Sequence, residues 1–218
     1  MSDHNHYSPF LARIYDKVLH IPVRNIRRSV VKALINADAV NVIDLCCGTG
    51  NQITYLREAG IDQAVGVDVS ENMLQQAWRK GLKGICLKMD ASATTFDNNA
   101  FDAAMMSFSL HEMNAGIAKN VFLESKRIVK PGGLILVVDY CFDEHTRIAG
   151  RFAVRIVEKF VGGGHYRNFK YFMGHDLLLK FSDGLSVREK KRFLFGAVGL
   201  WVYINEESTK NFLLSNVG

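Results

Sequence analysis

The stretch Val42-Ile43-Asp44-Leu45-Cys46-Cys47-Gly48-Thr49-Gly50 decides the fold. It joins a short apolar run, typical of a buried strand, to a glycine-rich turn, and a predicted helix follows at Gln52 to Glu58. Small residues in such a turn let the backbone approach a ligand, and the free N–H groups at the start of the helix face the same space. The stretch therefore predicts a ligand-binding turn between a strand and a helix.

The glycine pattern of this turn argues against a dinucleotide. A dinucleotide fingerprint places a third glycine three residues after Gly50, where this chain has Ile53. The carboxylate of Asp44 would also bring negative charge close to a pyrophosphate. We therefore expect a ligand without phosphates. S-adenosylmethionine, an adenosine that carries a sulfonium and an amino acid, is such a ligand.

Short apolar runs alternate with amphipathic segments along the chain. The predicted strands are Val40 to Cys46, Ala64 to Val69, Ile85 to Met89, Ala103 to Ser107 and Leu134 to Tyr140, and the helices between them are Gln52 to Glu58, Glu71 to Lys80 and Ala115 to Val129. Strands separated by helices form βαβ units with a parallel sheet. We read Leu185 to Ile204 as a terminal hairpin. The pattern predicts an α/β fold with a seven-stranded, mostly parallel sheet, an antiparallel terminal hairpin and helices on both faces.

A single domain over residues 1–218 is expected from the length of the chain. Its predicted parts are a helical cover (1–39), a cofactor-binding core (40–140), a helical lid and acceptor region (141–184), and the hairpin with its tail (185–218). Within the cover and the lid, Tyr7 to Leu34 reads as a lid or sheet-covering segment, and helices at Ile148 to Phe160 and Phe169 to Phe181 flank Gly162-Gly163-Gly164. These aromatic-rich segments are expected to close over a second substrate.

Composition narrows the class of protein. The net charge of +5 comes from scattered Lys and Arg, which indicate solvated faces, with attraction to anionic substrates or peripheral contact with lipid headgroups as the alternative. The apolar run Leu134 to Val138 is too short to span a bilayer, and Met1 to Phe10 does not resemble a secretory signal, so we expect a cytoplasmic protein. The four cysteines lack metal-binding spacing and are read as free thiols, so no metal site is expected. The sequence does not indicate an oligomeric state.

Polar residues follow further predicted strands, at the edge where open α/β sheets bind ligands. Asp68 can accept hydrogen bonds from both ribose hydroxyls, and Asp90 can meet the adenine amino group beside the small Ala91. The expected cofactor contacts are Asp44, Cys46, Cys47, Gly48, Thr49, Gly50, Asp68, Val69, Met73, Asp90, Ala91, Ser107 and Phe108. Asp44 fits a role in orienting the turn as well as direct contact, and the two thiols also fit simple packing.

In this order, the motifs resemble those of class I S-adenosylmethionine-dependent methyltransferases over about Asn41 to Tyr140. A narrower similarity, to the ubiquinone/menaquinone biosynthesis C-methyltransferases, rests on Ile14-Tyr15-Asp16, the Asp44 to Gly50 stretch, Ser107-Phe108-Ser109-Leu110 and Tyr166-Arg167-Asn168-Phe169. The resemblance implies a Rossmann-like class I methyltransferase fold and cofactor contacts by Thr49, Asp68, Asp90, Ala91 and Ser107. This chain has His111-Glu112 where those enzymes tend to have Arg-Asn.

The expected activity is transfer of a methyl group from S-adenosylmethionine to a small, apolar or aromatic acceptor by in-line displacement. The candidate catalytic residues are His111, His165, Tyr166 and Arg167. Either histidine could accept a proton and Arg167 could stabilise an anionic acceptor, although each also fits an ordinary structural role. One alternative is a non-catalytic accessory protein that binds S-adenosylmethionine or S-adenosylhomocysteine. A nucleic-acid methyltransferase is less favoured, because the basic residues form no continuous stripe.

Overall fold

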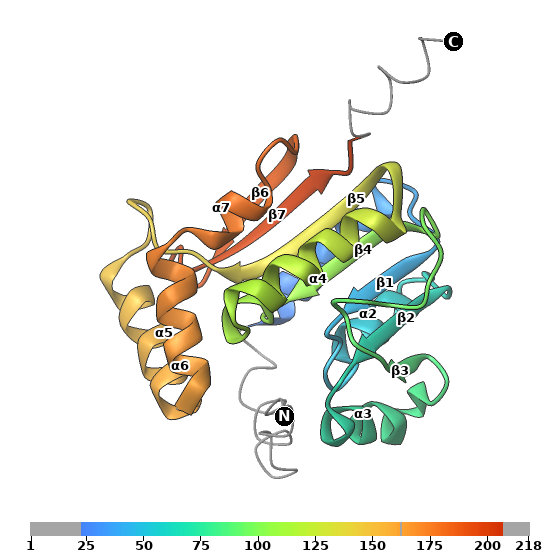
Figure 1. Cartoon of the computed structure of the whole chain (residues 1–218), viewed down its shortest axis with the longest axis horizontal. Helices are drawn as coiled ribbons and strands as arrows, with labels where there is room; N and C mark the ends of the chain where they lie inside the picture. The colour runs from blue at the N-terminus through green and yellow to red at the C-terminus, as the bar shows by residue number, and fades with distance from the viewer. Residues whose placement is uncertain (1–22, 162, 207–218) are drawn as a thin grey trace.

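The computed structural model describes residues 23–161 and 163–206, and its centre is a seven-stranded sheet of order β3-β2-β1-β4-β5-β7-β6 (Figure 1). The strands are β1 (Val42–Leu45), β2 (Ala64–Asp68), β3 (Cys86–Lys88), β4 (Phe101–Ser107), β5 (Val129–Tyr140), β6 (Val187–Phe193) and β7 (Val198–Ile204). Strands β1 to β5 pair in parallel, whereas β7 pairs antiparallel with both β5 and β6. The predicted parallel sheet and terminal hairpin are confirmed.

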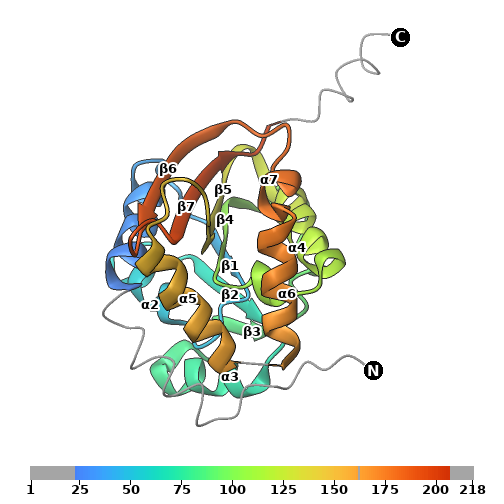
Figure 2. The same cartoon turned by 90° about the vertical axis from the view of Figure 1, so that its left-hand side faces the viewer.

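Both faces of the sheet are buried, which explains why its strands are almost continuously apolar. Along β1, Val42 belongs to the hydrophobic cluster on one face, and Ile43 and Leu45 belong to the cluster on the other. The first face is covered by a helix over residues 23–35, by α2 (Asn51–Glu58) and by α3 (Glu71–Ala77). The opposite face is covered by α4 (Ala115–Ile128) and α7 (Leu177–Phe181), as Figure 2 shows.

The first described helix is a cover of the sheet. Its residues 23–35 bury Ile26, Val30 and Leu34 completely or nearly so in the cluster that also holds Val42. This packing agrees with the sheet-covering reading of Tyr7 to Leu34 for the described part. The preceding part, residues 7–22, lies outside the described residues.

Two further helices lie beyond the carboxyl ends of the strands (Figure 2). They are α5 (Ile148–Val161) and α6 (Gly163–Gly174), which contact one another, and α6 also packs on the short 3-10 helix η2 (Leu110–Glu112) that follows β4. This layer corresponds to the predicted helical lid. In the described residues no helix combines the length and the apolar character needed to cross a bilayer.

The prediction of one helix over Phe169 to Phe181 is wrong. The chain forms α6 and α7 there, because Asp176 takes a left-handed φ of 49° that a continuous helix does not allow. In addition, α6 begins at Gly163, within the run of glycines that the sequence predicts to separate two helices. His165 and Arg167 consequently lie in the first turns of a helix and not in a glycine-rich loop.

Two predicted helix ends also differ from the structure. The helix predicted over Glu71 to Lys80 ends at Ala77, and a π-helical turn follows in which Gly81 has a φ of 84°. The helix predicted to reach Val129 ends at Ile128, and β5 already includes Pro131-Gly132-Gly133. Asn205 completes the backbone pairing here, because its carbonyl accepts from Gly132 N at 2.8 Å and its N–H donates to Gly133 O at 2.8 Å.

The glycine-rich turn after β1 depends on two glycines that differ in their surroundings. Gly48 and Gly50 have left-handed φ values of 54° and 72°. A Cβ on Gly50 would lie 2.5 Å from Leu82 Cδ1, whereas a Cβ on Gly48 would meet no described atom within 4 Å. The turn is therefore tightly packed on the Gly50 side and open on the Gly48 side.

This asymmetry predicts unequal costs for two alanine substitutions. Gly48→Ala should lower the free energy of unfolding by about 1–2 kcal/mol, the cost of a left-handed residue with a Cβ. Gly50→Ala should cost a further 1–3 kcal/mol or so, because it also overpacks the core. Urea denaturation of both variants measures the difference, and equal losses would contradict the packing described.

Candidate functional site

The turn at Gly48 is tied to the neighbouring strand by Asp68. This carboxylate ends β2, accepts the Gly48 N–H at Oδ2 over 2.8 Å and accepts the Ser70 N–H at Oδ1 over 2.8 Å. Burial raises the pKa of Asp68, and the backbone N–H groups of Ser70, Gly48 and Val69 partly offset that rise. The side chain of Ser70 then caps α3 by accepting the Met73 N–H, which places Met73 and Val69 beside the same edge.

Asp44 is a buried carboxyl group on the face covered by the helix 23–35. Burial raises the pKa of Asp44 to about 8, although the positive charge of Arg27 partly lowers it. One carboxyl oxygen, Oδ1, is buried without a hydrogen-bond partner among the described residues. Such an atom is costly unless a donor completes it. The arrangement fits a cationic or N–H-bearing ligand group at the turn.

The predicted contacts at the ends of β3 and β4 lie at the same edge of the sheet. Asp90 is exposed, with Oδ1 accepting from Ser92 N and Ser92 Oγ, and Ala91 is buried beside it. Ser107 Oγ is buried without a hydrogen-bond partner in the described part of the chain. Phe108 follows with a left-handed φ of 55° and donates its N–H to Val138 O at 2.7 Å.

The adjacent thiols are part of the turn. The N–H groups of Cys46 and Cys47 both donate to Val67 O at 2.9 Å, which fixes the end of β1 against β2. Burial raises the pKa of the Cys46 thiol well above its usual value, and a hydrogen bond with the Cys86 thiol does the same for Cys47. Both groups are therefore neutral thiols. Their observed contacts agree with the packing alternative, and contact with a ligand remains a prediction.

His111 forms a buried ion pair with Asp139. Nδ1 of the imidazole lies 2.5 Å from Asp139 Oδ1, and both side chains are buried. Asp139 also accepts the N–H of His111 at 3.3 Å and the N–H of Tyr140 at 2.7 Å. Burial lowers the pKa of His111, but the charge and hydrogen bond of Asp139, the hydrogen bond of Glu158 and the charge of Glu112 together outweigh it and raise the pKa to about 10. At neutral pH His111 is therefore an imidazolium.

Helix α5 brings a second carboxylate to this ion pair. Glu158 is buried, its Oε1 accepts the Tyr140 hydroxyl at 2.9 Å, and the same oxygen lies 3.6 Å from His111 Nε2. The imidazolium thus sits between a carboxylate at the end of β5 and one from the helical layer. Aromatic rings surround it, with Tyr140 at 4.5 Å and Phe169 at 6.1 Å between ring centroids.

Helix α6 brings two of the other three candidate catalytic residues to the same place. His165 Nδ1 lies 3.9 Å from Glu112 Oε2, and the Asn168 side chain donates to the Glu112 carbonyl at 2.8 Å. Tyr166 stacks on Phe169 with centroids 6.2 Å apart. Arg167 is exposed and is not brought to this group. The pair His111-Glu112 therefore joins η2 both to β5 and to α6.

Sequence reasoning missed three charged residues of this site: Arg27, Asp139 and Glu158. Asp139 could have been noticed as an acidic residue near the end of a buried apolar strand. Glu158 falls on the buried side of α5 with Val154, a helical spacing that the sequence does contain. Arg27 lies in the basic stretch Arg24 to Arg28, a pattern that indicates a solvated face, and no local signal shows which cation of such a stretch turns inward.

Comparisons with known proteins agree with this arrangement. Residues 42–133 match a family model described as a methyltransferase domain. A demethylmenaquinone methyltransferase of Renibacterium salmoninarum is 34% identical over 117 residues, which are 54% of this chain and 48% of the relative. The chain thus spans about half the length of that curated relative. The resemblance to class I methyltransferases is confirmed for the core.

Solved structures extend the similarity of fold to most of the chain. An O-methyltransferase family protein from Burkholderia thailandensis has a TM-score of 0.66 at 18% identity, over 91% of this chain and 60% of the other. An S-adenosylmethionine-dependent methyltransferase from Aquifex aeolicus has a TM-score of 0.58 at 17% identity, over 91% and 98% of the two chains. The Rossmann-like methyltransferase fold is confirmed.

The buried ion pair predicts a specific pH dependence of stability. The folded-state pKa of His111 lies above its unfolded value, so the stabilisation is complete below about pH 6.5 and is lost as the pH rises through about 10. His111→Gln should cost about 3–5 kcal/mol of unfolding free energy at pH 7, because it leaves buried carboxylates unpaired. The difference in unfolding free energy between wild type and variant should decrease toward pH 10, as measured by urea denaturation at a series of pH values.

His145→Gln is the matched control, because that histidine is exposed and faces the exposed Glu144 at 3.4 Å. It should leave the stability curve almost unchanged. A gap that stays constant for His111→Gln from pH 6 to 10 would show that no buried imidazolium is present.

Proposed function

We propose that this protein is a methyltransferase that uses S-adenosylmethionine and acts on a small, apolar or aromatic acceptor. The observation that carries the proposal is the Gly48-Thr49-Gly50 turn, which is open at Gly48, is tethered to Asp68 and lies beside Asp44 Oδ1, an atom with no hydrogen-bond partner among the described residues. The match of residues 42–133 to a methyltransferase domain supports the same reading.

The donor set of this turn fits S-adenosylmethionine. The cationic amino group of its methionine part would supply the hydrogen-bond donor that Asp44 Oδ1 needs, and Asp68 would accept from the ribose hydroxyls with its remaining lone pairs. Asp90, beside the small Ala91, would meet the adenine amino group. The three carboxyl groups Asp44, Asp68 and Asp90 suit a cofactor that is positively charged and lacks phosphates.

When bound, S-adenosylmethionine supplies a methyl group that its sulfonium has already activated for in-line displacement. The protein has to orient the acceptor and exclude water from the edge of the sheet. The rings of Tyr140, Phe169 and Tyr166 provide apolar surface there. His111, held as an imidazolium, would stabilise an anionic acceptor oxygen, and His165 beside Glu112 is the better candidate for accepting a proton.

The similarity to a demethylmenaquinone methyltransferase supports an aromatic acceptor of the quinol type. A buried imidazolium suits such an acceptor, because attack on the methyl group requires an electron-rich oxyanion or ring carbon. The proposed acceptor is a small phenol or quinol, which would contact His111 inside the matched residues 42–133 and Tyr140, Tyr166 and Phe169 outside them.

Calorimetric titration tests cofactor choice. S-adenosylhomocysteine should bind and NAD should not. Asp68→Asn should make the binding free energy of S-adenosylhomocysteine less favourable by about 1.5–3 kcal/mol, which is the contribution of hydrogen bonds to a charged group. Asp62→Asn, at an exposed acid, is the control.

Transfer of labelled methyl to a panel of phenols and quinols then separates an enzyme from an accessory protein. Tight cofactor binding without turnover on any acceptor would favour the accessory protein, and tight NAD binding would end the proposal.

Asp44 gives the cofactor affinity a predicted pH dependence. Because its pKa is about 8 in the free protein, it must lose a proton to pair with a cationic amino group. Affinity for S-adenosylhomocysteine should therefore fall by up to about tenfold for each pH unit below 8. Asp44→Asn should bind more weakly and lose this dependence. If wild type and Asp44→Asn respond alike to pH, Asp44 only orients the turn.

A further inference from the structure

Helix α5 exposes a row of large apolar side chains. Ile148, Phe152 and Ile156 are 85%, 65% and 40% exposed, and their spacing of four places them on one face of the helix. The opposite face is buried, with Val154 and Glu158 directed into the protein. A single exposed apolar residue needs no explanation, but a continuous row on one helix marks a contact surface.

The same exposed face is basic. Arg155 and Lys159 lie among the apolar residues and are exposed, and Arg147 is exposed just before the helix begins. The one acidic residue of α5 is Glu158, which is buried. The neighbouring Glu144 is exposed and faces His145. The outer face of α5 therefore combines apolar side chains with positive charge and has no carboxylate of its own.

The β6–β7 turn extends this surface. Phe195 is 62% exposed at the tip of the turn, beside the partly exposed Leu194. The Phe195 carbonyl accepts the Arg147 N–H at 3.0 Å, and a Cβ on Gly150 would lie 3.3 Å from Phe195 Cβ. The β6–β7 turn therefore packs directly against the start of α5. We call Ile148, Phe152, Arg155, Ile156, Lys159, Leu194 and Phe195 the α5 surface.

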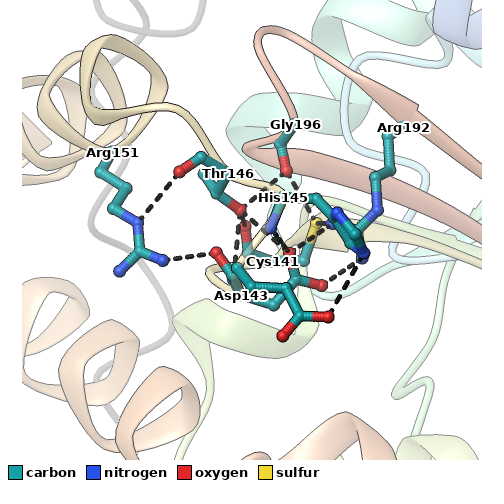
Figure 3. Close-up of polar contacts among 8 residues, drawn as sticks. Cys141, Asp143, His145, Thr146, Arg151, Arg192 and Gly196 are labelled. Carbon is teal, nitrogen blue, oxygen red and sulfur yellow. Dashed lines mark hydrogen bonds and ion pairs between the residues drawn. The ribbon is translucent and has the colours of Figure 1, made fainter.

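A polar network holds the two parts of the α5 surface in fixed relation (Figure 3). Asp143, in the loop before α5, forms a two-contact ion pair with Arg192 of β6. The Thr146 hydroxyl donates to the Gly196 carbonyl at 3.1 Å, and Arg151 Nη2 donates to the Asp143 carbonyl. These hydrogen bonds hold the exposed residues of α5 and of the β6–β7 turn in a fixed position relative to each other.

We propose that the α5 surface docks on an anionic lipid bilayer. Apolar side chains flanked by Lys and Arg insert at the headgroup boundary, while the cations contact acidic headgroups. A second copy of this chain suits the surface less well, because it would bring Arg155 and Lys159 against like charges. The proposal does not depend on methyl transfer, since docking requires neither cofactor nor acceptor.

Docking here would have a structural consequence for the candidate active site. The inner face of α5 carries Glu158, which contacts Tyr140 and lies near His111. One helix would therefore separate the lipid from the buried imidazolium. An acceptor that dissolves in the bilayer would enter the aromatic surroundings of His111 along this helix.

Co-sedimentation of the full chain with vesicles tests the proposal. The protein should bind phosphatidylcholine vesicles that contain phosphatidylglycerol and bind pure phosphatidylcholine at least tenfold more weakly, with the difference reduced by salt. Phe152→Ser with Phe195→Ser should reduce binding at least tenfold, and so should Arg155→Glu with Lys159→Glu. Arg155 also has a contact to lose on substitution, because its guanidinium carbon lies 5.9 Å from the centroid of the Phe142 ring.

Helix α4 provides matched controls, because Leu123 is 48% exposed and Lys119 is exposed on it. Leu123→Ser and Lys119→Glu should leave vesicle binding unchanged. In addition, Phe152→Trp fluorescence should shift to the blue with anionic vesicles, and that of Leu123→Trp should not. No binding to anionic vesicles, or equal loss with the control variants, would overturn the proposal. So would a dimer in equilibrium sedimentation that Phe152→Ser dissociates, because a second copy would then be the occupant.

Discussion

The ion pair between His111 and Asp139 governs how the helical layer sits on the sheet. Asp139 lies one residue before the end of β5, and no part of it is exposed to water. A buried carboxylate is costly unless it is paired and hydrogen-bonded. Asp139 obtains its partners when η2 closes over the end of β5, which places His111, and with it Glu112, at a defined position. Helix α6 then packs on η2, and α5 reaches the same point through Glu158.

The charges at this edge of the sheet follow one pattern. Asp44, Asp68, Asp139 and Glu158 come from β1, β2, β5 and α5, and the observed compensating cations near them are Arg27 and His111. Burial raises the pKa of Asp44 to about 8, so the free protein holds a proton there at neutral pH that a cationic ligand would displace. This excess of carboxyl groups favours a positively charged ligand group at this edge of the sheet.

Helix α5 has two faces with different surroundings. Its buried side contributes to the surroundings of the imidazolium, and its outer side carries an apolar and basic surface that is out of place on a helix exposed only to water. Bracing by Asp143, Thr146 and Arg192 ties both faces to the hairpin.

The sequence by itself determined the order of strands and helices, the glycine turn and the closeness of Asp68 to it. Parallel strands bring their carboxyl ends to one edge, so an acid at the end of β2 must lie near a turn at the end of β1, and the 2.8 Å contact with Gly48 agrees. Only the tertiary structure decided the roles of Arg27, Asp139 and Glu158. Their local patterns match those of ordinary surface or core residues, and their energies depend on partners far away in the chain. Burial creates those partnerships, because it removes the water that would otherwise satisfy each charge.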